Sequence, residues 1–154
     1  MSITFSVSGE PVPQPRARIT TRCGHGHAYT PASHPIHAYR AAIAKAAREA
    51  GATPTLAEPI TLIVDLVWVR PKSHYRKRVS QDDPLHPIRE DAPKIPRADC
   101  SNCLKGIEDA LNGVAWVDDK QVGRLVVEKS YGQEARTTVR VSCCLLYTSP
   151  SPRD

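Results

Sequence analysis

The order of apolar and polar residues along the chain predicts four main strands, and a tight turn over residues 23–27 followed by a short strand at residues 28–30. Residues 3–8 alternate between apolar and polar side chains, which is typical of a half-buried strand. Residues 60–69 are apolar almost throughout, which favours a central strand. Asp65 is the exception within this run, and we expect it to face outward. Residues 121–129 and 136–142 predict two antiparallel strands, with Gly132 in the hairpin turn between them.

The same pattern predicts a first helix over residues 35–50. Pro35 is well suited to open this helix, and Gly51 is well suited to end it. Apolar side chains recur in it at helical spacing. We expect the buried stripe to consist of Ile36, Tyr39, Ile43, Ala46 and Ala50.

A second helix is predicted over residues 102–111, with one apolar and one polar face. Asp99 or Ser101 is a suitable N-cap, and Gly113 a suitable stop. The two faces consist of Leu104, Ile107 and Leu111 on the apolar side, and of Asn102, Lys105 and Asp109 on the polar side. Together the elements predict a single α+β domain, with a mixed, mainly antiparallel sheet and two principal helices packed on one side.

Composition narrows the function classes. With 154 residues and 16.9 kDa, the chain is long enough for one hydrophobic core. A net charge of +5 and an isoelectric point near 9.1 are compatible with binding DNA, although they are weak evidence alone. No apolar run reaches the roughly 18 residues of a membrane span. Residues 1–6 read as a strand rather than a signal peptide, so we expect a cytoplasmic protein with no membrane partner.

The last residues are treated separately. Residues 144–154 break the preceding strand pattern and match what one reading frame of a common sequencing adapter encodes. We therefore predict that the domain covers residues 1–143 and that 144–154 are an artefactual tail. The tail carries one Arg and one Asp, so the net charge of the domain is the same without it.

Candidate chemistry lies on the second predicted helix and just after it. Two adjacent carboxylates, Asp118 and Asp119, follow its polar face after a Gly turn. Carboxylate oxygens suit a hard cation such as Mg²⁺, and a nearby Lys suits a phosphate. With the positive net charge, this combination indicates metal-assisted cleavage of a nucleic-acid backbone. The plain alternative is an amphipathic helix with a solvated face.

The same residues resemble a known family. The spacing Asp99-x-x-Asn102-x-x-Lys105-x-x-x-Asp109 is followed by Ala-Leu-Asn-Gly, a Trp step and Asp-Asp-x-Gln-Val. This pattern resembles the RusA family of Holliday junction resolvases, which are small and often prophage-encoded endonucleases. Residues 5–18, 29–31 and 129–132 also resemble the family, and the likeness extends over residues 3–142.

The resemblance implies catalytic roles for three residues. The first catalytic Asp of the family falls on Asp99 and its essential Lys on Lys105. Its last catalytic Asp falls on the pair Asp118 and Asp119. Side chains that are adjacent in a strand point to opposite faces, so we expect only one of the two in the site, and we favour Asp119. The implied cofactor is Mg²⁺, for which Mn²⁺ can substitute, with no small-molecule cofactor. The implied reaction is phosphodiester hydrolysis at four-way DNA junctions.

One position departs from the family. A further Asp of the pattern, two residues after the first, is replaced here by Ser101, whose hydroxyl is a weaker Mg²⁺ ligand than a carboxylate. Either the site binds metal with fewer charges, or another acid contributes, or activity is low. Asp109 is the nearest such acid by sequence, and we assign it and Asn102 a supporting role.

Basic residues suit contact with DNA phosphates. Three follow a proline-stiffened stretch, and three lie in the long proline-rich connection over residues 70–97: Arg16, Arg18 and Arg22, and Arg76, Lys77 and Arg78. A solvated loop and plain disorder are the alternatives for these two segments. The resemblance further implies a two-fold homodimer, because resolving a junction takes two symmetric cuts.

Two other functions remain open at this point. A catalytically weak junction-binding protein follows if Ser101 disables the metal site. A zinc-stabilised nucleic-acid-binding module follows if the C-x-x-C pair Cys100 and Cys103 joins Cys23, His25 and His27 around Zn²⁺.

Overall fold

The computed structural model describes residues 2–22, 25–54, 58–76 and 88–143. The predicted tail 144–154, two of the basic candidates, Lys77 and Arg78, and part of the predicted tight turn at residues 23–27 lie outside these ranges. None of the helices within them is long and apolar enough to cross a membrane.

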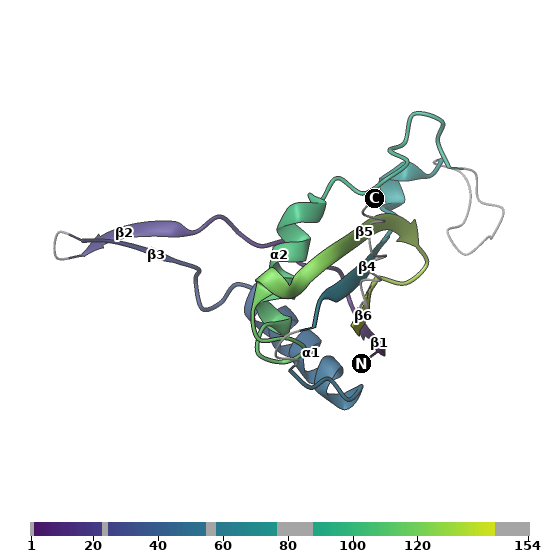
Figure 1. The fold of residues 1–154 in the computed structure, drawn as a ribbon. Helices are drawn as coiled ribbons and strands as arrows, with labels where there is room; N and C mark the ends of the chain where they lie inside the picture. Colours follow the sequence, from purple (N-terminus) through teal and green to yellow (C-terminus); the bar gives the residue numbers. More distant parts are fainter. Residues whose placement is uncertain (1, 23–24, 55–57, 77–87, 144–154) are drawn as a thin grey trace, which may run out of the picture.

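A four-stranded sheet forms the body, with the order β1-β6-β4-β5 (Figure 1). Its strands are β1 (Ser2–Ser8), β6 (Arg136–Cys143), β4 (Ile60–Val69) and β5 (Val122–Gly132). β6 runs antiparallel to both β1 and β4, whereas β4 and β5 are parallel. The prediction of a mixed, mainly antiparallel sheet is therefore confirmed, with the apolar strand β4 between two neighbours.

The connection between β5 and β6 corrects a prediction. The two strands are not a hairpin, because β4 lies between them and pairs with both. Gly132 is the last residue of β5 rather than a turn residue, and a Cβ there would lie 2.6 Å from Val67 Cγ1. Because glycine has no Cβ, the backbone at Gly132 can lie close to the Val67 side chain of β4. From there, residues 133–135 cross over the end of β4 to reach β6. Three residues can span the roughly 10 Å between strands that flank a third.

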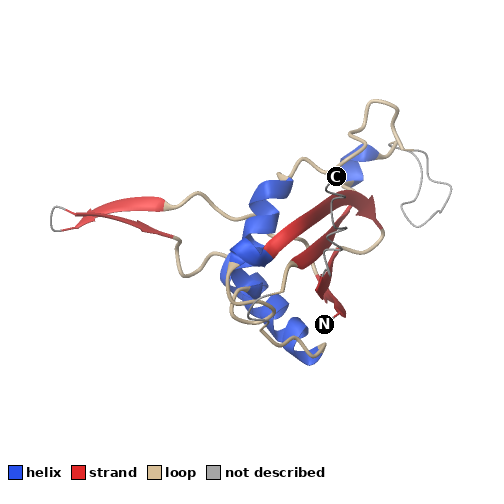
Figure 2. Cartoon of the chain, in the orientation of Figure 1, coloured by secondary structure: helices blue, strands red, loops and turns tan. Residues whose placement is uncertain are grey.

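Both helices pack on one side of the sheet (Figure 2), as predicted. α1 spans Ile36–Glu49 and α2 spans Cys100–Leu111. Of the predicted stripe in α1, Ile36, Tyr39 and Ile43 are buried, and Ala47 joins them, whereas Ala46 and Ala50 are only partly buried. In α2, Ile107 and Leu111 are fully buried and Leu104 partly so. The helices approach closely at Gly106, where a Cβ would lie 2.9 Å from Ile36 Cδ1.

Two polar groups on the sheet have defined partners. The Tyr39 hydroxyl on α1 forms a hydrogen bond of 2.7 Å with Thr137 Oγ1 on β6, and burial raises the pKa of Tyr39 to about 12. Asp65 of β4 alternates with the buried Val64 and Leu66, and it lies 3.8 Å from the Arg140 guanidinium. Its side chain is 32% exposed, in line with the outward orientation predicted for it.

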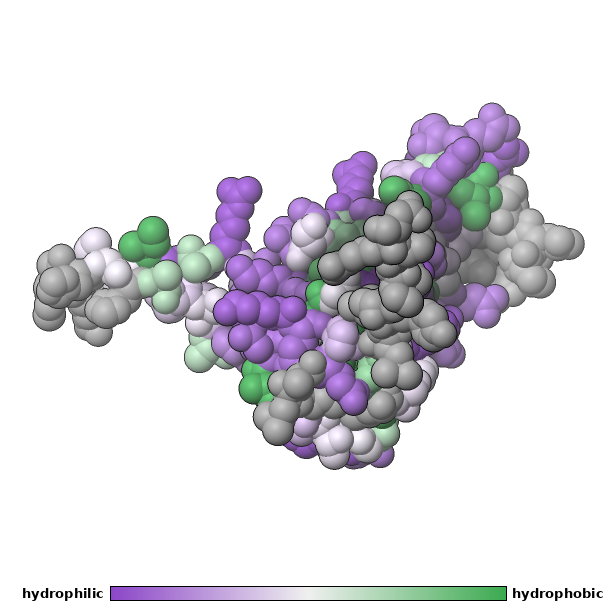
Figure 3. All heavy atoms as spheres, in the orientation of Figure 1, coloured by the Kyte–Doolittle hydropathy of each residue, from purple (hydrophilic) through white to green (hydrophobic). Residues whose placement is uncertain are grey.

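A second, two-stranded sheet extends away from the body as an arm (Figure 1). β2 (Arg18–Arg22) pairs antiparallel with β3 (His25–Tyr29). Only a short strand at residues 28–30 was predicted here, because the proline and arginine residues obscure the strand pattern of residues 19–21. An isolated two-stranded hairpin is marginally stable alone. Figure 3 shows apolar side chains on this arm, where Ile19 is 75% exposed and Tyr29 45%.

Candidate active site

The N-terminal end of α2 is capped by the first candidate acid. Asp99 is the N-cap, and its Oδ1 accepts a hydrogen bond of 2.9 Å from the Ser101 amide. Both side chains are exposed. Lys129 of β5 donates from Nζ to the Ala98 carbonyl oxygen at 2.7 Å. This bond attaches the start of α2 to the sheet, so the position of Asp99 is set from two sides.

The polar face of α2 is exposed as predicted, with Asn102, Lys105 and Asp109 open to solvent. Asp109, however, forms an ion pair with Arg40 of α1. The Arg40 guanidinium also donates to Gln14 Oε1 at 2.6 Å. Asp109 therefore joins the two helices, and in this arrangement its carboxylate is a weak substitute for the acid missing at position 101.

The segment before the arm lies along the same helix. The Gln14 amide donates to the Asn102 carbonyl oxygen at 2.8 Å, and Pro11 is buried. The proline-rich stretch is thus packed against α2 rather than solvated throughout. It leads directly to Arg16 and Arg18, which are exposed at the base of the arm.

The two adjacent acids after α2 lie at a short 3₁₀ helix, Asp119–Gln121 (η2), rather than in a strand. Asp118 is its N-cap and takes part in a capping box with Gln121. Asp119 instead accepts a hydrogen bond of 2.9 Å from Trp116 Nε1 through Oδ1, and Trp116 is fully buried. A buried indole therefore orients Asp119 while its side chain remains exposed, whereas Asp118 stabilises the turn.

Asp119 lies beside the later turns of α2. Burial raises the pKa of the Glu108 carboxyl, and the nearby charges of Asp119 and Asp109 raise it further. Asp99 is nine residues before Glu108, which is about 13 Å along a helix axis. Lys105 lies between Asp99 and Glu108 along the helix, so its ammonium group separates the N-cap carboxylate from the acidic region around Glu108.

Metal ligation in this arrangement would involve few carboxylates. Among the described residues, no three His, Cys, Asp or Glu side chains are grouped closely enough to hold a metal ion. Mg²⁺ in nucleic-acid enzymes commonly takes one or two carboxylates and fills its remaining positions with water and substrate phosphate. The donor set here, exposed carboxylate oxygens beside a Lys, fits that mode of binding.

Three residues of this region were not anticipated from the sequence. Glu108 is close to Asp119, Trp116 anchors Asp119, and Lys129 anchors the start of α2. Glu108 lies three residues after Lys105, a spacing that indicates a shared helical face. The contacts of Trp116 and Lys129 had no comparable signal, because they depend on tertiary packing.

Cys100 and Cys103, the two described cysteines of the alternative zinc site, are poorly suited to bind Zn²⁺. Cys103 is fully buried against the core, and burial raises the pKa of its thiol to about 11. Zn²⁺ requires the thiolate, which this environment disfavours. Cys100 and Cys103 are free thiols. Cys23 and the side chains of His25 and His27 lie outside the described part of the chain.

The basic candidates lie on segments that extend from opposite ends of the α2 and β5 region (Figure 1). Arg16, Arg18 and Arg22 belong to the arm and its approach. Arg76 belongs to the connection between β4 and α2, where it lies 3.7 Å from Glu90 on the surface. This placement leaves the exposed face of α2 between two basic segments.

Comparisons with known proteins agree with this picture. The family model described as "Endodeoxyribonuclease RusA" matches residues 8–142. A protein of Bacillus subtilis (strain 168) named "Uncharacterized protein YqaN" is 30% identical over 139 residues, which cover 90% of this chain and 94% of that protein. The matched region contains all of α2, the Asp118–Asp119 pair, β4, β5 and all of β6 but its last residue, whereas of β1 it includes only Ser8.

Proposed function

The chain belongs to the RusA family of endodeoxyribonucleases, which resolve Holliday junctions, and we propose on this premise that it cuts four-way DNA junctions with Mg²⁺. The proposed catalytic residues are Asp99, Lys105 and Asp119. The observation that carries the proposal is the exposed face of α2. There, Lys105 lies between the N-cap Asp99 and Glu108, and the charge of the Trp116-anchored Asp119 raises the pKa of Glu108.

Asp119 and Asp99 are proposed to hold one or two Mg²⁺ ions, with Mn²⁺ as a substitute. The spacing of about 13 Å along α2 between Asp99 and Glu108, the residue near Asp119, favours one ion at each acid. When bound, the ion would supply an activated water and neutralise charge that develops on the phosphate. Asp118 is better suited to a structural role, since its cap supports the turn that carries Asp119. Ser101 can contribute a hydroxyl or a bound water at most. The proposed site therefore relies on DNA phosphate oxygens to complete the metal shell.

Lys105 is proposed to contact the scissile phosphate or the leaving oxygen. Its ammonium group forms no ion pair with any of the residues described, so it is available for an incoming phosphate. An ammonium group stabilises charge that increases in the transition state, provided that it is held within hydrogen-bonding distance. Arg16 and Arg18 on the arm and Arg76 on the other side would hold the duplex arms through phosphates, without reading bases.

One assay tests this function against the alternatives. The full chain is incubated with a labelled four-way junction and with linear duplex, with and without Mg²⁺ or Mn²⁺. We expect paired, metal-dependent nicks on the junction alone. Binding without cutting in every condition supports a junction-binding protein, and stoichiometric zinc by native mass spectrometry supports the zinc module.

Ser101→Asp should restore the missing carboxylate. We expect this variant to reach half-maximal cleavage at about 10-fold lower Mg²⁺, because one further anionic ligand binds the ion more tightly. Ser101→Asn is the matched control, since it has the size of Asp without the charge. A Mg²⁺ requirement that is the same in both variants would contradict a role for position 101 in the metal site.

We propose that the protein is a homodimer, because two symmetric cuts require two active sites. We expect light scattering to give twice the 16.9 kDa of one chain at working concentration. A monomer that nevertheless makes paired nicks would refute this part. The cytoplasmic location predicted from the sequence likewise stays a prediction.

A further inference from the structure

A hollow of about 580 Å³ opens where β4 and β5 end. It is lined by aromatic, aliphatic and guanidinium groups, chiefly from Val69, Arg70, Tyr75, Ile88 and Tyr131. Val69 and Ile88 are 46% and 44% exposed, large fractions for apolar side chains. Figure 3 shows hydrophobic atoms next to hydrophilic ones at this end of the molecule. The hollow is within the size range of small-ligand sites.

The walls of this hollow are held in place. The Arg70 guanidinium carbon lies 4.4 Å from the centre of the Tyr131 ring, and Arg70 Nη1 donates to the Pro93 carbonyl oxygen at 3.0 Å. His74 approaches the same ring edge to face, with 5.5 Å between the ring centres. Arg70 therefore presents a flat, oriented guanidinium rather than a mobile side chain.

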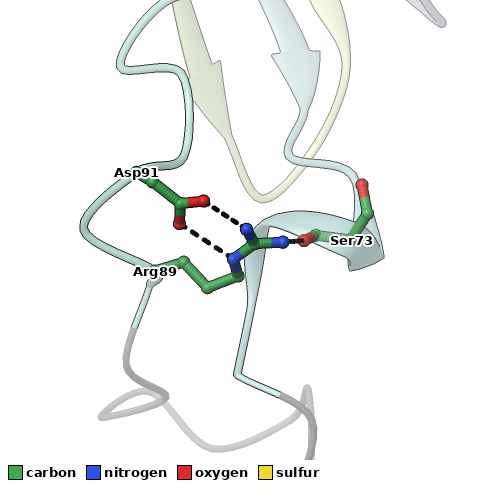
Figure 4. Close-up of polar contacts among 3 residues, drawn as sticks. All are labelled: Ser73, Arg89 and Asp91. Atoms are coloured by element: carbon green, nitrogen blue, oxygen red, sulfur yellow. Dashed lines mark hydrogen bonds and ion pairs between the residues drawn. The ribbon is translucent and has the colours of Figure 1, made fainter.

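The two flanks of the β4–α2 connection are joined beside the hollow. Tyr75 and Ile88 form an antiparallel bridge, and the Arg89 amide donates to the His74 carbonyl oxygen at 2.9 Å. The Arg89 side chain forms an ion pair with Asp91 and donates to the Ser73 carbonyl oxygen at 3.2 Å (Figure 4). These contacts make the base of the connection a stem that supports Tyr75 and Ile88.

The chemistry of the lining differs from that of a second hollow of similar size on the sheet. That one is lined by charges of both signs, including Asp65, Glu128 and Arg136, and has no aromatic wall. Tyrosine rings with an adjacent guanidinium are instead the groups on which nucleobases stack. The Nδ1 atom of His74 is buried and has no hydrogen-bond partner among the residues described, so a polar group is also present beside the ring.

The hollow lies near the proposed cleavage site. Tyr131 follows Lys129 by two residues in β5. Lys129 donates a hydrogen bond to the carbonyl oxygen of Ala98, which is next to Asp99. Two residues of a strand cover about 7 Å, and successive bases of a stacked strand are about 3.4 Å apart. A base in the hollow would belong to a nucleotide about two positions from a phosphate at the start of α2.

We propose that this hollow, the Tyr131–Arg70 pocket, takes an unpaired or unstacked nucleobase about two nucleotides from the scissile phosphate and so determines which junction sequences are cut. The inference rests on the proposed function, because it takes the start of α2 as the cleavage site. Tyr131 and Tyr75 provide the aromatic surface. The remaining N–H groups of Arg70 read acceptors on the base edge. The basic residues of the arm, together with Arg76, supply affinity without sequence preference, whereas this pocket supplies the preference.

A protein–DNA mutant cycle tests the stacking. Tyr131→Leu and Tyr131→Phe are compared on junctions with a normal nucleotide or an abasic site near the cut. We expect Tyr131→Leu to slow cleavage of the normal junction about 10-fold and Tyr131→Phe to resemble the wild type. On the abasic junction, Tyr131→Leu should cause no further loss. Equal losses in both variants, or losses that multiply on the abasic junction, would overturn the proposal.

The base preference tests Arg70. On junctions with all sixteen dinucleotides at the cut, the wild type should prefer a few sequences, and Arg70→Lys should reduce that preference at least 5-fold while junction affinity stays within about 2-fold. An unchanged preference would refute reading by Arg70. A change of molecular mass in Tyr131→Leu by light scattering would show that the pocket instead contacts a second chain, and would overturn the proposal.

A binding measurement separates this inference from the proposed function. 2-Aminopurine is placed at the flanking position, and its fluorescence is followed in EDTA, where no metal-dependent cutting takes place. A fluorescence change with the wild type and Tyr131→Phe, but not with Tyr131→Leu, supports the pocket even if the protein cuts no junction. Cutting without any fluorescence change at flanking positions refutes the pocket and leaves the nuclease intact.

Discussion

Replacing Asp119 by Asn is expected to slow junction cleavage at least about 100-fold, while junction affinity without metal stays within about 3-fold. Asn retains an acceptor oxygen for the 2.9 Å hydrogen bond from Trp116 Nε1, so the turn can keep its conformation. What is lost is the anionic oxygen that the proposed metal site needs. Residues that merely support metal ligands are worth about 10- to 100-fold in affinity or activity, so a direct ligand should be worth at least about 100-fold. Single-turnover cleavage of a labelled junction measures the effect.

Asp118→Asn is the matched control for this change. Asp118 is adjacent in sequence and equally charged, but its side chain caps η2. Its replacement should lower stability by at most about 1 kcal/mol and change cleavage less than 10-fold. If Asp118→Asn abolishes cleavage and Asp119→Asn does not, the assignment within the pair is wrong. Partial recovery of Asp119→Asn at high Mn²⁺ would indicate that the loss is one of metal binding.

The features that the sequence predicts well are those encoded locally. β4 is the same ten residues that the apolar run predicts. Asp99, one of the two N-caps predicted, caps α2, which begins two residues earlier than expected. Both rest on short-range patterns, namely burial along a strand and the unsatisfied amides at a helix start. The motif from Asp99 to Asp109 is likewise encoded within one short segment, and Lys105 is on the exposed face of α2 that its spacing predicts.

The features that the sequence missed depend on segments far apart in the chain. The turn after Gly132 was read as a hairpin, but it crosses over β4, which starts more than sixty residues earlier. Asp109 was considered a substitute metal ligand, but its carboxylate is paired with Arg40 on the other helix. The Tyr131–Arg70 pocket unites the end of β4, the stem and the end of β5, and no single window of sequence contains it.

The other large effect is expected at Lys105. Replacement by Gln should lower the rate of the cleavage step roughly 100- to 1,000-fold, because the ammonium group that would stabilise developing charge on the phosphate is lost. The side chain is exposed on α2, and it forms no ion pair with the described residues, so the fold should be unaffected. Single-turnover rates at saturating protein separate this loss from weaker binding.

Lys120→Gln is the control, since Lys120 is also exposed, lies 3.8 Å from Asp118 and loses the same charge. It should reduce cleavage less than 3-fold. The two proposed roles on α2 also predict different responses to metal. Excess Mg²⁺ should recover part of the activity of Asp119→Asn but none of that of Lys105→Gln, because an added ion can refill a weakened site but cannot replace a positioned ammonium group. Recovery of Lys105→Gln by metal would mean that Lys105 acts through metal binding rather than on the phosphate itself.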